Sequence, residues 1–235
     1  MKFLAPIPSS VRSAPDLVAL RLREAIFTGE LRSGEQLPPE TELAKGFGIA
    51  LMTVRAALSG LRDVGLLVTV RGRNGGTFVS EEVGERIAEA ARQAPLSKAD
   101  IRDLTDWRRG VAGEACFLAA QRATEGQLQR IKQAAIEFDN HGIKFPEVRF
   151  ADAKYHTLIA EISGSASLLR QEVEIQGLLT KLILGTEHKP LRSKDIAGYS
   201  HDEITSAILA GKSEAARQAM IDHAEYTFIW TTMLL

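Results

Sequence analysis

Apolar residues recur at the spacing of amphipathic helices along most of the chain, and this period changes only near residue 70. In the first third, the spacing predicts a helix that starts at Asp16. A short helix is expected to start at Pro39 and to be broken by Gly46 and Gly48. A further helix is expected over Thr53–Val64.

The segment that follows has the pattern of a β-hairpin. The runs "LLVTV" (66–70) and "TFV" (77–79) are typical of strands, and the glycine-rich "RGRNGG" between them is typical of a turn. Two helices, a projecting third helix and a hairpin follow one another in a winged helix-turn-helix. In that fold the projecting helix fits the major groove of DNA.

Beyond residue 80 the pattern is helical. Helical windows are expected near 81–94, 99–123, 125–141, 146–163, 166–187, 199–211 and 213–232. The prediction is a mainly α fold with an N-terminal winged helix-turn-helix and a C-terminal all-helical antiparallel bundle. Its expected parts are a flexible arm (1–14), a winged helix-turn-helix DNA-binding domain (15–79), a linker helix (80–96) and a helical domain (97–235).

The composition indicates the cellular compartment and shows that charge is unevenly distributed along the chain. The chain has 235 residues, of which 45% are hydrophobic and 25% are charged, as in globular proteins. Residues 1–80 carry a net charge of +3 and the rest −4, which favours a polyanion partner at the front. The single cysteine, Cys116, excludes a disulfide within the chain. No stretch approaches the roughly 20 apolar residues of a membrane span, so we expect a cytoplasmic protein.

A stretch of the first domain resembles the DNA-binding domain of GntR-type bacterial regulators: "GEQLPPETELAKGFGIALMTVRAALSGLRDVGLLVTVRGRNGGTFV". The matching positions are Gly34, Leu37, Pro38, Glu40, Leu43, Ala44, Gly48, Thr53, Val54, Arg55, Ala57, Leu58, Leu61, Gly65, Leu66, Gly72, Gly76, Phe78 and Val79. The resemblance implies a homodimer on an inverted-repeat operator of double-stranded DNA.

The recognition helix departs from the family pattern in its first turn. Thr41 and Leu51 stand where the family has arginines that contact operator DNA, and leucine cannot form the paired hydrogen bonds by which arginine reads guanine. Leu51 and Met52 either touch thymine methyl groups or pack inward. The polar residues left for DNA contacts are Lys45, Thr53, Arg55, Arg71, Arg73 and Asn74.

The helical domain contains a set of possible metal ligands. Asp152 and His156 are spaced i and i+4 on one helix face, and His201 and His223 lie at the two ends of a later helical segment. One carboxylate and three imidazoles suit zinc, nickel, manganese or iron. The Asp-x-x-x-His spacing is not diagnostic by itself, since histidines are more often solvated or packed in a core.

Residues 100–225 resemble the FCD effector domain that accompanies GntR heads. The matching positions are Arg108, Asp152, His156, His201, Ile204, Ala207, Ile208, Gly211, Met220 and His223. The resemblance implies that the Asp and the three His bind a divalent metal and that the effector is a small organic acid or sugar acid.

The resemblance makes residues 97–235 the effector-binding and dimerisation domain. Arg108 is the expected partner of the effector carboxylate, with Arg109 as the second candidate. A salt bridge within the domain is the alternative role of Arg108. The glutamate that the family has four residues after this arginine is Ala112 here. Glu114 is nearby but on another face.

These features predict a metabolite-responsive transcriptional regulator and not an enzyme. The alternative is a metal-dependent hydrolase with an accessory winged-helix head, in which Glu161 or Glu203 would be the general base. An oligomerising scaffold is the third possibility. Both alternatives predict no sequence-selective DNA binding.

Overall fold

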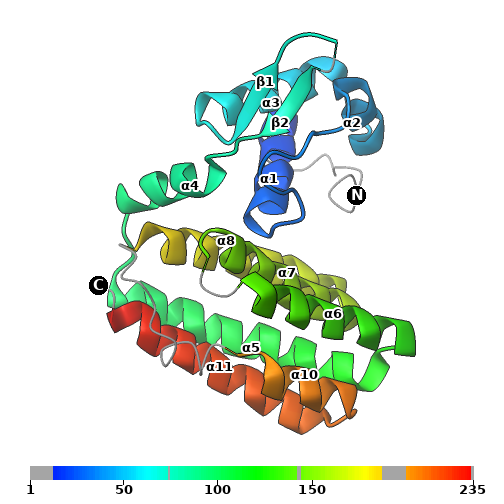
Figure 1. The fold of residues 1–235 in the computed structure, drawn as a ribbon, viewed down its shortest axis with the longest axis vertical. Coiled ribbons are helices and arrows are strands. Elements are labelled where there is room, and N and C mark those ends of the chain that lie inside the picture. The colour runs from blue at the N-terminus through cyan, green and yellow to red at the C-terminus, as the bar shows by residue number, and fades with distance from the viewer. Residues whose placement is uncertain (1–12, 74, 142–143, 187–199, 234–235) are drawn as a thin grey trace. The chain divides into compact units, whose positions relative to one another are not determined.

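The computed structural model describes residues 13–73, 75–141, 144–186 and 200–233 (Figure 1). The chain divides into two compact units, residues 1–87 and 88–235. Each unit is described by itself.

The first unit contains a helical core and a two-stranded hairpin. Its elements are α1 (Ala14–Phe27), α2 (Glu40–Phe47), α3 (Leu51–Asp63), β1 (Leu67–Val70) and β2 (Gly76–Val79). The strands pair antiparallel, with Leu67 opposite Val79. Helix α1 packs on α3, and Val18 and Leu22 on α1 and Leu58 on α3 are fully buried. This is the winged helix-turn-helix order expected from the sequence.

Two helix ends differ from the expectation. Gly46 does not break α2, because the helix continues to Phe47, whose side chain is 1% exposed. Burying a phenylalanine stabilises by about 1.5–3 kcal/mol, which exceeds the roughly 1 kcal/mol cost of a glycine inside a helix. Gly48, with φ of 68°, ends the helix as expected. Helix α3 begins at Leu51, two residues before Thr53, so Leu51 and Met52 form its first turn.

The second unit is a bundle of helices. Helix α4 (Val83–Arg92) spans the boundary between the units. The bundle helices are α5 (Lys98–Arg122), α6 (Glu125–His141), α7 (Glu147–Ile162), α8 (Ala166–Gly185), α10 (Asp202–Leu209) and α11 (Ser213–Met233). Ser97 and Asp100 form a capping box that fixes the start of α5. The long helices α5 and α11 lie side by side (Figure 1).

The bundle has two main apolar clusters. One joins α5, α6, α7, α10 and α11 around residues such as Cys116, Ile159 and Met220. The other is formed by buried residues of α5 and α8, and Trp107 of α5 and Trp230 of α11 pack against it. Within the described residues, no helix combines the length and the apolar character that a membrane crossing requires. The mainly helical chain with a small antiparallel wing confirms the predicted fold class.

Candidate functional site

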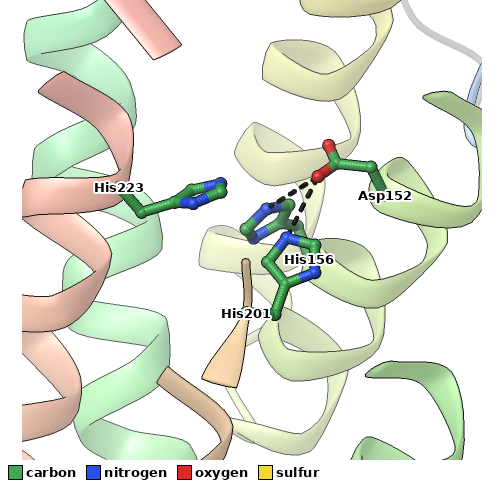
Figure 2. A group of neighbouring side chains, drawn as sticks. All are labelled: Asp152, His156, His201 and His223. Atoms are coloured by element: carbon green, nitrogen blue, oxygen red, sulfur yellow. Dashed lines mark ion pairs between the residues drawn. The ribbon is translucent and has the colours of Figure 1, made fainter. Parts of the chain in front are cut away.

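Four side chains from three parts of the bundle meet in its interior. Asp152 and His156 lie one turn apart on α7, His201 immediately precedes α10, and His223 lies on α11. Each is at most 5% exposed. Their potential ligand atoms all lie within 4.8 Å of one another. Figure 2 shows the carboxylate and the three imidazoles pointing toward a common centre.

Aromatic packing fixes the position of His201, whose neighbours in the chain are polar. Its ring stacks on Tyr155, with centroids 4.1 Å apart, and lies 4.4 Å from the ring of Phe138. The Tyr155 hydroxyl is in turn hydrogen-bonded to Thr205 on α10 at 2.8 Å. The start of α10 is therefore joined to α7 beside the cluster.

The charges of the cluster are those of a metal-binding set. Asp152 Oδ1 lies 3.0 Å from His201 Nε2 and 3.6 Å from His156 Nε2 (Figure 2). Burial opposes ionisation of Asp152, but the Arg149 guanidinium and the imidazoles hold its pKa well below the usual value. Burial lowers the pKa of His156 to about 3 and that of His223 well below its usual value. Near neutral pH the carboxylate is ionised and these two imidazoles are neutral, as ligation requires.

The donor set fits a divalent transition metal. Two nitrogen or oxygen ligands at about 2.1 Å from one ion lie roughly 3–4 Å apart. A span of 4.8 Å between the ligand atoms therefore closes onto one ion through small side-chain rotations. Imidazole and carboxylate together suit zinc, nickel, manganese or iron.

Arg108 enters the same interior from α5 and is 2% exposed. Its Nη2 lies 3.0 Å from His156 Nε2, and its Nη1 donates to Thr227 Oγ1 at 3.1 Å. Ala112 is buried one turn further along, and Glu114 instead pairs with Arg217 at 2.6 Å. Arg108 is thus oriented by α7 and α11, without the glutamate that the family pattern has after it.

The sequence interpretation missed a buried polar network beside the cluster. Arg149, which is 1% exposed, donates through Nη1 to Asp152, through Nη2 to Gln176 and through Nε to Thr180. Gln176 then donates to Glu172 Oε1 at 2.7 Å. A signal was present, since Arg149 interrupts an apolar stretch three residues before Asp152. Its partners on α8 lie 27 and 31 residues away, and no local pattern connects them.

The residues proposed for DNA contact lie on α2, on α3 and at the tip of the hairpin. Lys45, Arg55, Arg71 and Arg73 are exposed and Thr53 is half-buried. Asn74 lies outside the described residues. Arg55 forms an ion pair with Glu40 at 2.8 Å, so its guanidinium already has a partner on α2.

The first turn of α3 presents an apolar side chain to solvent. Met52 is 68% exposed, whereas Leu51 is half-buried. Of the two roles left open by the sequence, inward packing does not describe Met52. Its thioether lies 3.9 Å from Arg55 Nη1, so the two side chains share one exposed surface of the helix.

Comparison with known proteins assigns both parts of the chain. The sequence profile of the FCD domain matches residues 103–226, and that of the bacterial regulatory proteins of the gntR family matches residues 16–79. The candidate cluster and Arg108 lie in the first of these matches, and the helix-turn-helix and wing lie in the second.

Individual relatives agree with this assignment. The HTH-type transcriptional regulator RmpR of Mycobacterium gastri is 35% identical over 164 residues, which are 68% of this chain and 59% of that protein. A protein of Escherichia coli K12 named as an L-lactate dehydrogenase operon regulator is 29% identical over 240 residues, covering 94% of this chain and 87% of that one. A solved GntR regulator from Rhodococcus sp. RHA1 covers 95% of this chain with a TM-score of 0.54 at 22% identity, which supports the fold.

Proposed function

Because the chain belongs to the GntR family of bacterial transcriptional regulators and carries an FCD domain, we propose that a carboxylic acid, bound at a metal ion in the helical unit, controls its affinity for DNA. The family and the names of its relatives make the chain a DNA-binding transcriptional regulator and not an enzyme. The hydrolase and scaffold alternatives therefore lose their support.

The convergence of Asp152, His156, His201 and His223 carries the proposal for the effector site. These four residues hold the metal. The bound metal supplies a Lewis-acidic centre with coordination positions left for a carboxylate oxygen. The protein contributes a dry surrounding, since all four side chains are buried, and low dielectric strengthens every charge interaction there.

Arg108 is the residue of this chain that pairs with the effector carboxylate. In the structure its Nη2 lies 3.0 Å from His156 Nε2. A nitrogen lone pair that accepts from Arg108 cannot at the same time bind a cation. If His156 held a metal through Nε2, this Arg108 donor would be available to the effector carboxylate. Thr227 on α11 keeps the other end of the guanidinium in place.

Helix α3 and the wing form the DNA-binding surface of the proposal. In this proposal Arg55 and Thr53 contact the groove from α3, Lys45 contacts DNA from α2, and Arg71 and Arg73 contact the backbone or minor groove from the wing. Asn74 stays a candidate from the sequence alone. The protein acts in the cytoplasm as a homodimer on an inverted repeat, since two-fold symmetry calls for two related half-sites. With Leu51 and Met52 in the first turn, apolar contacts and DNA shape provide part of the specificity.

The metal site is tested by metal analysis of purified variants. Wild type is expected to bind one ion per chain, and His156→Ala to lose it while keeping its DNA affinity. His141→Ala is the matched control, because His141 is the last residue of α6 and is not one of the four clustered residues. A metal content in His156→Ala equal to that of wild type removes the proposed site.

The DNA-binding part is tested by selecting bound duplexes from a random pool with competitor DNA at near-physiological salt. Enrichment of a short inverted repeat supports a sequence-specific dimer. Failure to enrich any motif, with and without metal and carboxylic acids, means that the arginines missing at Thr41 and Leu51 are indispensable.

A further inference from the structure

Glu172 carries a buried carboxyl group with one hydrogen-bonded oxygen, and burial raises the pKa of this group above its usual value. It lies on α8 with 0% exposure, and its Oε1 accepts a hydrogen bond from Gln176 at 2.7 Å. Its Oε2 is buried and has no hydrogen-bond partner among the residues that the structure describes. An unpartnered buried carboxylate oxygen is costly, and such an atom in a native protein calls for an explanation.

The neighbouring cations do not supply that partner. The three guanidinium nitrogens of Arg149 donate to Asp152, Gln176 and Thr180. The two Nη atoms of Arg108 are directed to His156 and Thr227. Packing does not require a carboxylate there, because a leucine or methionine has similar bulk at no electrostatic cost.

The position of Glu172 connects it to the cluster. Gln176 donates to Glu172 Oε1 and accepts a hydrogen bond from Arg149, and Arg149 also donates to Asp152 of the cluster. Helix α8 packs against both α7 and α5. Glu172 therefore faces the same interior as the proposed metal and Arg108, from a helix that contributes no metal ligand.

We propose that Glu172 determines the specificity of the effector site by accepting, at Oε2, a hydrogen bond from a hydroxyl or ammonium group of the effector. This inference rests on the proposed function, since the metal and Arg108 hold the effector carboxylate. The effector is then a carboxylic acid with a hydrogen-bond donor on its carbon chain. An unsubstituted acid leaves Oε2 of Glu172 unpaired.

The test is calorimetric titration of the zinc-loaded full-length protein with matched acids of the same carbon skeleton. One set is propionate, lactate and alanine, and a second is butyrate, 4-hydroxybutyrate and 4-aminobutyrate. Hexanoate and gluconate extend the range to six carbons. We expect a donor-bearing acid to bind about 10-fold or more tightly than its unsubstituted parent. Comparing the hydroxyl-bearing acid with the amino-bearing acid of each set shows whether Oε2 accepts from a hydroxyl or from an ammonium group.

Substitutions at Glu172 test whether its carboxyl group causes the preference for acids that carry a hydrogen-bond donor. Glu172→Met removes the acceptor at similar bulk and is expected to reduce the preference to about 2-fold or less. Glu172→Gln keeps a neutral acceptor and is expected to retain an intermediate preference. Glu174→Gln, two residues along α8 and exposed, is the matched control and keeps the wild-type preference. Metal content and tryptophan-monitored unfolding show that each variant is folded and loaded.

The outcomes separate this inference from the proposed function. If wild type binds the parent acids and their substituted forms equally, or if Glu172→Met keeps the preference, Glu172 has no role in specificity and the metal-carboxylate site survives. If the zinc-loaded wild type binds no acid of either kind, the proposed function and this inference both fail.

Discussion

Replacing Arg149 by methionine tests whether Asp152 is held as a buried anion. Both side chains are 1% exposed, and the guanidinium of Arg149 is paired with the carboxylate of Asp152. Arg149→Met keeps much of the apolar bulk but leaves Asp152, Gln176 and Thr180 without their donor. Removing one partner of a buried ion pair costs about 3–5 kcal/mol. We expect the metal-free variant to lose that much unfolding free energy.

Tryptophan fluorescence during urea unfolding measures this loss in the relevant unit. The chain has two tryptophans, Trp107 and Trp230, and both lie in the helical unit against one apolar cluster. The signal therefore follows that unit and not the winged helix. Arg130→Met is the matched control, because its ion pair with Glu161 is long, at 3.5 Å, and half exposed. It is expected to cost less than about 1 kcal/mol.

Added zinc gives the experiment a second readout. The cation supplies the positive charge that Asp152 loses with Arg149, so zinc is expected to stabilise Arg149→Met by more than it stabilises wild type. Equal losses in Arg149→Met and Arg130→Met would refute the assignment of a buried, ion-paired Asp152. An identical zinc effect in wild type and variant would show that Arg149 and the metal do not share this carboxylate.

Three further predictions concern the protonation of the cluster, its cysteine and the DNA surface. Unfolded imidazoles take up protons below about pH 6.5, whereas folded His156 stays neutral to about pH 3. Metal-free protein should therefore lose unfolding free energy as the pH falls from 6.5 toward 3, by up to about 1.4 kcal/mol per pH unit for each such histidine. A flat profile in urea titrations would contradict this. Cys116 is only 1% exposed, and burial raises the pKa of its thiol. A thiol reagent should therefore modify it only after unfolding. Arg55→Ala should weaken binding to a selected duplex about 10-fold or more in fluorescence anisotropy, and Arg62→Ala, near the other end of α3, should not.

Local patterns in the sequence were enough to predict most helices and the wing. The window 125–141 coincides with α6, and the expected strands differ from β1 and β2 by a residue at one end. Helix ends were less predictable where tertiary contacts decide. Gly46 remains helical because Phe47 is buried in the core, which the local sequence does not reveal.

The candidate site was predictable where a motif or spacing marked it. Asp152 and His156 share a helix face, and the resemblance to the FCD domain linked them to His201 and His223. The supporting network was not predictable in this way. Arg149 was marked only by its place in an apolar stretch, and its partners Gln176 and Thr180 lie on another helix. Nothing in the local sequence shows that Glu172 is buried.

The orientation of Arg108 shows the same limit. The sequence offered Ala112 where the family has a glutamate, so the residue that directs the guanidinium was unknown. The structure supplies Thr227, 119 residues away on α11, and His156 on α7. When a residue far along the chain takes over the role of a missing neighbour, the local spacing of the sequence does not show it.

The measurement that tests the central claim most directly is the affinity of wild type for a selected duplex, with and without zinc and a donor-bearing carboxylic acid. The account predicts that the acid changes the DNA dissociation constant about 5-fold or more in the zinc-loaded protein and leaves it unchanged in the metal-free protein and in His156→Ala. Equal DNA affinity with and without the acid in the zinc-loaded wild type would contradict a metal-centred effector site that controls DNA binding.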